Sequence, residues 1–246
     1  MNIGQYFAVD YTGAPFVLFG TAHLISLLVL LAAIVAVFNA KNIGETSKKR
    51  VRVVMAIGLW TIESSWHLWN IVNGMWTMDT MLPLHMCSIL IWLSGYMLIT
   101  KNESIYPFVY FMGIGGALQA VLTPESGIYG FPHFRYIQTV TNHSLLILSA
   151  VWMTVVEGYR PTWKSLLRVM LVANVYMAVV FVINLGLGSN YLFINHKPPT
   201  ASLIDLLPAW PYYIPFLELI GLATFTILYL PFAIKDLVAK KQSVTA

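Results

Sequence analysis

The stretch FVLFGTAHLISLLVLLAAIVAVF at residues 16–38 decides the fold class of this chain. It contains 23 residues and no Asp, Glu, Lys or Arg. A helix of about 20 apolar residues crosses the ~30 Å hydrocarbon core of a bilayer, because all its backbone hydrogen bonds close within the segment. This stretch therefore predicts a transmembrane helix.

The rest of the chain has the same character. Of the 246 residues, 58% are hydrophobic, and the 14 Lys+Arg and 10 Asp+Glu together make up only 10%. Soluble domains contain about 25% charged residues. With a mean hydropathy of +0.73, the chain has too few polar groups to cover a soluble surface or to remain disordered. The composition excludes ordinary soluble, disordered and collagen-like proteins.

Six further apolar stretches are long enough to cross a membrane as helices. We therefore predict an all-α polytopic membrane protein, a single domain over residues 1–246 with seven transmembrane helices. The fourth stretch is short and rich in glycine, which predicts close packing against a neighbouring helix. The predicted spans are residues 16–38, 52–73, 81–100, 105–122, 134–156, 165–187 and 211–234.

Positive charges lie almost entirely on one side of these spans. Twelve of the 14 Lys and Arg residues fall on connections of one side and at the C-terminus, while Arg135 and Lys197 fall on the other. Because cytoplasmic connections are rich in Lys and Arg, this asymmetry predicts an outside N-terminus and a cytoplasmic C-terminus. It also explains the basic charge balance, so no nucleic-acid partner is expected. The oligomeric state is not predicted.

The polar residues inside the spans share one depth. Polar groups within a membrane are costly, so they mark function or internal packing. Nearly all of them fall in the outer halves of the predicted helices, which predicts a polar cavity that opens outward. The alternative is that pairs such as Glu63–His67 and Arg135–Glu218 only hold helices together. The residues at this depth are His23, Glu63, His67, Asn70, His85, Cys87, Gln119, Arg135, Gln138, Asn142, His143, Asn184 and Glu218.

Two of the spans carry polar stripes. Residues Glu63, His67 and Asn70 are spaced i, i+4, i+7, so they lie on one face of a helix. A second stripe on the span 134–156 consists of Arg135, Gln138 and Asn142. We expect the two stripes to face each other across the interior.

Acyl transfer is the first chemistry that these residues predict. A thiolate attacks an acyl carbonyl when a nearby His takes its proton, and an Arg or amide donor stabilises the oxyanion. The single cysteine, Cys87, cannot form an internal disulfide. His85 is two residues away, about 200° around a regular helix, so His143 is the better base unless Pro83 unwinds the span. The alternative for Cys87 is a packed hydrophobic side chain.

Two further interpretations use the same residues. Histidines His23, His67, His85 and His143 lie at similar depth and could bind a metal with Glu63, or a haem. Alternatively, the cavity binds or transports a small polar or anionic solute, with Arg135 holding the anion. The inner halves of the spans offer no polar exit path, which speaks against transport.

Four stretches of this sequence resemble the bacterial YwaF-type integral membrane proteins. They are LPLHMCSI at 82–89, GGALQAVLTP at 115–124, FPHFRYIQTVTNH at 131–143 and NYLFINHKPPTASLIDLLPAWPYY at 190–213. These seven-span proteins are distantly similar to a vertebrate transmembrane acyltransferase that builds polyunsaturated ether phospholipids. The resemblance implies a Cys/His acyl-transfer pair on Cys87 and His143. The family motif positions are His85, Cys87, Gln119, Pro124, His133, Arg135, His143, Asn190 and Tyr191.

The leading hypothesis is a multi-pass protein of the bacterial cytoplasmic membrane that acts on a lipid or a lipid-linked acyl group. In this hypothesis Cys87 is the nucleophile, His143 the base, and Arg135 and Asn142 contact the oxyanion. Membrane lipids are the expected partners, and no cofactor or metal is expected. The remaining predicted ligand-binding residues are Gln138, His85, Glu63, His67, Gln119 and Glu218.

Overall fold

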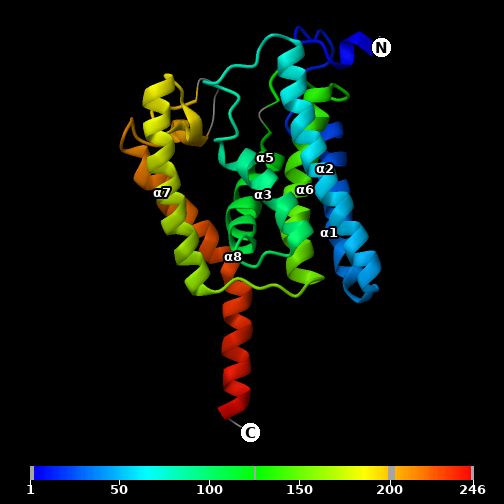
Figure 1. Ribbon diagram of the computed structural model, residues 1–246, viewed down its shortest axis with the longest axis vertical. Helices are drawn as coiled ribbons and strands as arrows, with labels where there is room; N and C mark the ends of the chain where they lie inside the picture. The colour runs from blue at the N-terminus through cyan, green and yellow to red at the C-terminus, as the bar shows by residue number, and fades with distance from the viewer. Residues whose placement is uncertain (1–2, 125, 199–202, 245–246) are drawn as a thin grey trace. The chain divides into compact units, whose positions relative to one another are not determined.

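The computed structural model describes residues 3–124, 126–198 and 203–244, and these residues are helical throughout their ordered elements (Figure 1). The prediction of an all-α fold is confirmed. Residues 199–202 of the fourth resemblance stretch lie outside the described residues. The main helices are α1 (Thr21–Asn39), α2 (Glu45–Val72), α3 (Met86–Thr100), α4 (Tyr106–Phe108), α5 (Ile114–Leu122), α6 (Phe134–Val155), α7 (Trp163–Leu187) and α8 (Tyr213–Val244). Short 3-10 turns are η1 (Ile3–Tyr6), η2 (Ala40–Asn42), η4 (Tyr191–Phe193) and η5 (Leu203–Leu206).

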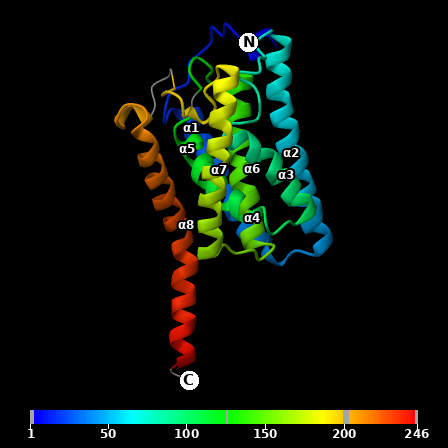
Figure 2. The same ribbon diagram turned by 60° about the vertical axis from the view of Figure 1, so that its left-hand side comes forward.

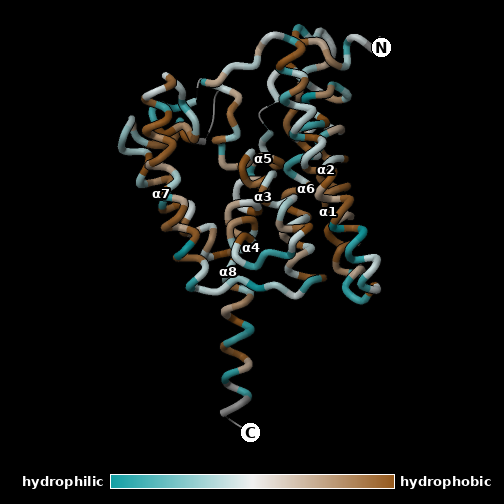
Figure 3. The backbone as a smooth tube through the Cα atoms, viewed as in Figure 1, coloured by the Kyte–Doolittle hydropathy of each residue, from teal (hydrophilic) through white to brown (hydrophobic). Residues whose placement is uncertain are grey.

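Among the described residues, three helical segments are long and apolar enough to cross a membrane: Thr21–Asn42, Trp163–Leu187 and Tyr213–Lys240. Two shorter apolar helices cover Met86–Thr100 and Tyr106–Leu122. The hydropathy colouring shows α1 and α7 as mainly hydrophobic (Figure 3). Helices α2 and α6 are long enough but not apolar enough to be among these three segments, because they carry the charged and polar residues that the sequence places on spans 52–73 and 134–156.

The chain forms two compact units, each discontinuous in sequence. The first unit consists of residues 1–76 and 86–159, and the second of residues 77–85 and 160–246. In the first unit α6 is the central helix, since it contacts α1, α2, α3 and α5. These helices lie side by side in both ribbon views (Figures 1 and 2). Helix α2 also packs along α3, where a Cβ atom on Gly95 would lie 2.2 Å from Trp60 Nε1. Only glycine permits this approach.

The predicted fourth span is helical but not one regular α-helix. Between α4 and α5 the chain forms a π-helix, η3 (Val109–Gly113). Gly113 ends this segment against α6, where a Cβ atom would meet Leu146 at 3.4 Å. A Cβ atom at this distance would be in ordinary van der Waals contact, so the packing here does not require glycine. The π-helix adds a change of register that hydropathy does not reveal.

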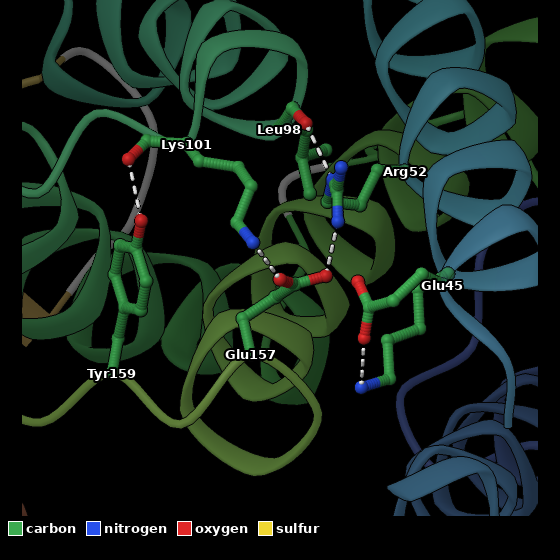
Figure 4. Close-up of polar contacts among 7 residues, drawn as sticks. Glu45, Arg52, Leu98, Lys101, Glu157 and Tyr159 are labelled. Atoms are coloured by element: carbon green, nitrogen blue, oxygen red, sulfur yellow. Dashed lines mark hydrogen bonds and ion pairs between the residues drawn. The ribbon is translucent and has the colours of Figure 1, made fainter. Parts of the chain in front are cut away.

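The end of the first unit where α2 begins and α6 ends is fastened by a buried carboxylate (Figure 4). Glu157 forms an ion pair with Arg52 and accepts a 2.6 Å contact from Lys101 Nζ. Arg52 Nε also donates to the Leu98 carbonyl at 3.0 Å, and the Tyr159 hydroxyl donates to the Lys101 carbonyl. We call these five residues the Glu157 clamp. Burial raises the pKa of Glu157, but hydrogen bonds and charges from Lys101 and Arg52 outweigh it and hold the pKa below its usual value.

The opposite end of the first unit is closed by the N-terminal segment. Three successive backbone carbonyls, those of residues 7–9, accept hydrogen bonds from aromatic side chains: Trp69 Nε1 at 2.8 Å, His133 Nε2 at 3.0 Å and the Tyr129 hydroxyl at 2.9 Å. His133 also caps α6, because its Nδ1 accepts from the Arg135 N–H at 3.1 Å. We call this arrangement the N-terminal clasp. Burial lowers the pKa of His133, and the Arg135 charge adds to this effect, while the bond to Ala8 opposes it.

The second unit is built from α7, α8 and the segments 77–85 and 188–212. Helix α7 starts with a capping box between Thr162 and Ser165 and ends at Gly188, which has the left-handed φ of 65° that glycine favours. Val180, Tyr191 and Ile194 form its buried core. The Tyr191 hydroxyl donates to the Met78 carbonyl at 2.7 Å and accepts from Leu82 N–H at 2.8 Å. Residues 77–85 are therefore held by a loop far along the chain.

This arrangement changes the start of the third predicted span. The sequence predicts a span from residue 81, but α3 begins only at Met86. Pro83 lacks a backbone N–H and disfavours the helical conformation of Leu82. The backbone N–H of Leu82 instead donates to Tyr191, so the first five residues of the predicted span join the second unit.

Candidate functional site

The two predicted polar stripes lie on α2 and α6 of the first unit, and a hydrogen bond joins them. Asn142 Nδ2 donates to Glu63 Oε2 at 2.7 Å, and both residues are only 2% exposed. Asn70, at the end of the α2 stripe, donates instead to the Trp66 carbonyl of its own helix. The contact between α2 and α6 therefore centres on one carboxylate and one carboxamide.

This pair leaves two buried acceptor atoms unsatisfied. Among the described residues, neither Glu63 Oε1 nor Asn142 Oδ1 has a hydrogen-bond partner. The Ser88 hydroxyl interacts with the Glu63 carboxyl, and His67 Nε2 lies 3.9 Å from Oε1, but neither closes a hydrogen bond to that oxygen. Most buried polar groups in proteins are paired, so two unpaired acceptors in one place indicate a site for a donor group or a bound water.

The tautomer of His67 is fixed by a neighbour. Trp76 Nε1 donates to His67 Nδ1 at 3.1 Å, and an indole nitrogen can only donate. His67 Nδ1 must therefore be the unprotonated nitrogen, and the ring proton resides on Nε2, on the side of Glu63. His67 thus presents a donor toward the unpaired oxygen of Glu63 at a distance too long for a direct bond.

Arg135 lies in the first turn of α6, and its side chain contacts Trp66 and Gln138. Its guanidinium stacks over the Trp66 ring at 4.0 Å and donates to Gln138 Oε1. It also acts electrostatically on Glu63 and His143. A guanidinium that is stacked and hydrogen-bonded in this way is a fixed positive charge, and it lies about two turns of α6 from Asn142.

His143 is oriented by its own helix. Its Nδ1 lies 2.8 Å from the Thr139 carbonyl, so this nitrogen carries the ring proton and donates. Nε2 is then the basic nitrogen of the neutral ring. A bond from Nδ1–H to a carbonyl is the usual way in which a histidine base is held in its working tautomer.

Cys87 lies in the first turn of α3 and is partly accessible. A Cβ atom on Gly116 of α5 would lie 3.8 Å from its Sγ atom. Cys87 interacts electrostatically with Glu63, so the thiol belongs to the same region as the α2–α6 pair. In the described part of the chain no hydrogen bond joins Sγ to His143.

The first unit thus contains eight of the ten predicted site residues. It links seven of them through contacts or electrostatic interactions, namely Glu63, His67, Cys87, Arg135, Gln138, Asn142 and His143. Gln119 of the same unit and two residues of the second unit are not joined to this group. His85 belongs to the second unit, where it packs against Tyr191 and its Nδ1 accepts from the Leu192 N–H at 3.4 Å. Glu218 also lies in the second unit, bonded to Asn174 Nδ2 at 2.9 Å. Gln119 is exposed, and its backbone carbonyl accepts from Thr123.

Sequence reasoning missed three neighbours of the site. Trp66 stacks on Arg135, Trp76 fixes His67, and Ser88 interacts with Glu63. A signal existed for Trp66, which follows Glu63 by three residues and so shares its face. Trp76 lies beyond the end of α2, so helical spacing could not place its side chain near His67.

The metal and haem interpretations require histidines that come together with other ligands. His23 uses both ring nitrogens, one toward Phe19 N–H and one toward the Val121 carbonyl. Within residues 3–124, 126–198 and 203–244 no group of three or more His, Cys, Asp or Glu side chains is placed to hold a metal ion.

A family model matches residues 18–229, which covers most of the chain and all its long helices as far as the middle of α8. The chain belongs to the TMEM164 family. No curated protein and no solved structure matches the sequence significantly. As a member of the TMEM164 family, a transmembrane family, the chain is a membrane protein. The finer assignments, to YwaF-type proteins and to a bacterial membrane, stay predictions.

Proposed function

We propose that this TMEM164 family member transfers an acyl group between membrane lipids at the polar site of its first unit. We also propose that both units form one transmembrane domain of seven spans, with the N-terminus outside and the C-terminus in the cytoplasm. The distribution of Lys and Arg supports this orientation. The Glu157 clamp then lies on the cytoplasmic side and the N-terminal clasp on the outside.

One observation carries the proposed function. The buried Glu63–Asn142 pair has two unpaired acceptor atoms in a region that also contains a partly accessible thiol, Cys87, and an oriented imidazole, His143. A hydroxyl of an acceptor lipid would supply the missing donor to Glu63 Oε1 or Asn142 Oδ1. This assigns Asn142 a role in holding the carboxylate and the acceptor, because its amide donor is already used by Glu63.

The reaction balances without a cofactor. Nε2 of His143 takes the thiol proton, and Sγ of Cys87 attacks the carbonyl carbon of a lipid ester, while Arg135 stabilises the oxyanion. The ester C–O bond breaks, the leaving alkoxide takes the proton, and the acyl group remains as a thioester. A lipid hydroxyl then attacks the thioester with His143 as base, the C–S bond breaks, and the thiolate recovers its proton.

This route requires a movement before the first step. Sγ of Cys87 and the His143 ring do not share a hydrogen bond in the described structure, and catalytic hydrogen bonds often close only when substrate binds. The carboxyl of Glu63 opposes a second negative charge on Cys87. Formation of a thiolate–imidazolium pair, in which the charges cancel, avoids this repulsion.

The experiment is to incubate purified protein with a defined phospholipid and to measure the intact mass. We expect an added acyl mass that hydroxylamine removes, and its absence in Cys87→Ser. Ser94→Ala, a small change on the same face of α3, is the matched control and should retain the added mass. Full lipid-remodelling activity in Cys87→Ser would refute the covalent mechanism.

Reversible binding of a small polar ligand is the second candidate, because the two unpaired acceptors require a donor but no covalent chemistry. In that case a ligand that copurifies should remain bound in Cys87→Ser and be lost in Glu63→Gln. Loss of the ligand in both variants would favour acyl transfer over simple binding.

A further inference from the structure

The second unit contains a polar pair in a groove between α7 and α8. Asn174 Nδ2 donates to Glu218 Oε2 at 2.9 Å and to the Met170 carbonyl at 3.0 Å. Asn174 lies 11 residues after the start of α7 and 13 before its end. At 1.5 Å per residue these separations are about 16 and 20 Å, so the pair lies near the middle of the α7 span.

Two apolar cavities share Asn174, Met177 and Ile214, and Glu218 lines the first of them. One has a volume of about 510 Å³ and the other about 500 Å³. Volumes in this range are typical of small-molecule sites, and methionine side chains adapt readily to flexible apolar ligands. The other lining residues are Met170, Pro215, Glu218, Leu219 and Leu222 in the first cavity, and Ala178, Phe181, Val182 and Ile194 in the second.

The hydrogen bonds decide which chemistry the groove accepts. Both protons of the Asn174 amide are used, one by Met170 and one by Glu218. What remains toward the groove is acceptor atoms, the second oxygen of Glu218 and Oδ1 of Asn174. None of the ion pairs among the described residues includes Glu218. The groove therefore combines a negative charge with acceptors only, inside an apolar span where such a group is costly unless paired.

We infer that this groove binds a membrane amphiphile with a protonated primary amine. An ammonium group has three donors and no acceptor, so it satisfies both free acceptors and neutralises Glu218. The two apolar cavities take the alkyl chain. A fatty acid or a phosphate group would place an anion beside Glu218 and is excluded by the same charge.

Binding of dodecylamine to the purified protein tests this inference, with native mass spectrometry and the shift in unfolding temperature as readouts. We expect one bound amine, and an affinity at least about tenfold lower in Glu218→Gln, which keeps the shape and removes the charge. Glu103→Gln, which changes net charge equally at an exposed position of the first unit, should bind like wild type. Dodecyltrimethylammonium, which has the charge but no N–H donor, should bind more weakly than dodecylamine.

A second variant tests the inference if Glu218→Gln fails to fold. Ala178→Trp fills the second cavity, leaves Glu218 in place, and should also lower dodecylamine affinity. Equal binding of dodecanoic acid, or unchanged dodecylamine affinity in Glu218→Gln, would overturn the inference. So would a dimer that Glu218→Gln converts to monomers without a change in amine binding, because the occupant would then be a second copy. Cys87→Ser should bind the amine normally, so the outcome is independent of the acyl-transfer proposal.

Discussion

Two glutamates of the first unit are buried to the same degree but paired differently. The side chains of Glu157 and Glu63 are each 3% exposed. Glu157 pairs with both Arg52 and Lys101, whereas Glu63 has an amide on one oxygen and no hydrogen bond on the other. The comparison teaches that burial alone does not identify a site. A carboxylate with every oxygen paired fastens helices, and one with an unpaired oxygen has capacity left for a ligand.

The largest expected effect is the loss of the Glu157 clamp. In Glu157→Ala, Arg52 remains buried without its partner, and removal of one member of a buried ion pair costs about 3–5 kcal/mol. We expect the free energy of unfolding in detergent to fall by about this amount. Asp236→Ala, which removes a carboxylate paired with Arg160 at the surface, is the control and should change little. Equal losses in the two variants would contradict the distinction between the buried and the exposed pair.

The matching change at Glu63 should separate stability from function. Glu63→Gln keeps a group that can bond to Asn142, so we expect the free energy of unfolding to change by about 1 kcal/mol or less. Acyl transfer should fall roughly a hundredfold or more, since the acceptor hydroxyl loses the carboxylate that binds it. If Glu63→Gln destabilises the protein as strongly as Glu157→Ala, then Glu63 is structural and the comparison fails.

Acid should act first on the N-terminal clasp. Burial lowers the pKa of His133 below its ordinary value of 6.5, so the folded protein favours the neutral ring. The neutral His133 ring therefore contributes its full stability above pH 6.5. This contribution is lost as the pH falls below 6.5 and through the folded-state pKa, because the unfolded chain binds the proton at a higher pH than the folded chain. Protonated Nδ1 could no longer cap α6. The charged or titratable groups around the ring are Arg135, Tyr11 and Tyr129.

Unfolding measured from pH 8 to pH 5 tests this expectation. His133→Asn retains a good helix cap but cannot titrate, so its stability should be flat over this range. A wild-type protein with equally flat stability would show that His133 does not control the clasp.

The Glu157 clamp should respond to acid only at lower pH. The pKa of Glu157 lies below its ordinary value of 4.5, so the clamp contributes its full stability above that pH. The contribution is lost as the pH falls below 4.5 and through the folded-state pKa. Unfolding measured between pH 6 and pH 3 should show this loss in wild type and not in Glu157→Gln. A loss of equal size in both proteins would assign it to other carboxylates.

The smallest effect is expected at the start of α2. Lys48 Nζ and Glu45 Oε1 are 2.7 Å apart, but the Glu45 side chain is 76% exposed. Exposed pairs of this kind contribute about 0–1 kcal/mol. Glu45→Ala should therefore lower the free energy of unfolding by less than about 1 kcal/mol, and added salt should reduce even this difference.

Hydropathy predicts where the long helices are but not where they end. Helix α2 begins at Glu45 rather than at residue 52, and α8 continues to Val244 rather than ending at 234. Charged residues such as Lys and Glu are good helix formers, so a helix continues past its apolar part. The length of the apolar stretch is limited by which side chains lipid accommodates, whereas the ends of the helix depend on the helix propensity of the residues.

Helical spacing predicts the stripes of Glu63 and Asn142, because a local period determines a face. It could not assign His85 and Glu218 to a different unit from Cys87, because their contacts with Tyr191 and Asn174 are tertiary. The Glu157 clamp was equally hidden. In the sequence Arg52 and Lys101 count as markers of orientation, and only the fold brings them to one carboxylate.

The discontinuity of the second unit has a consequence for biosynthesis. Leu82 emerges from the ribosome 109 residues before Tyr191, whose hydroxyl accepts its backbone N–H. At synthesis rates of 5–20 residues per second, residues 77–85 wait roughly 5–20 s for that partner. Helices of the first unit can assemble during this interval, while the Leu82 N–H and the Met78 carbonyl lack their partner until Tyr191 has been synthesised. Nascent chains of a Leu82→Cys variant truncated before Asn190 should therefore be open to thiol labelling at this position, and chains extended beyond Tyr213 should be protected.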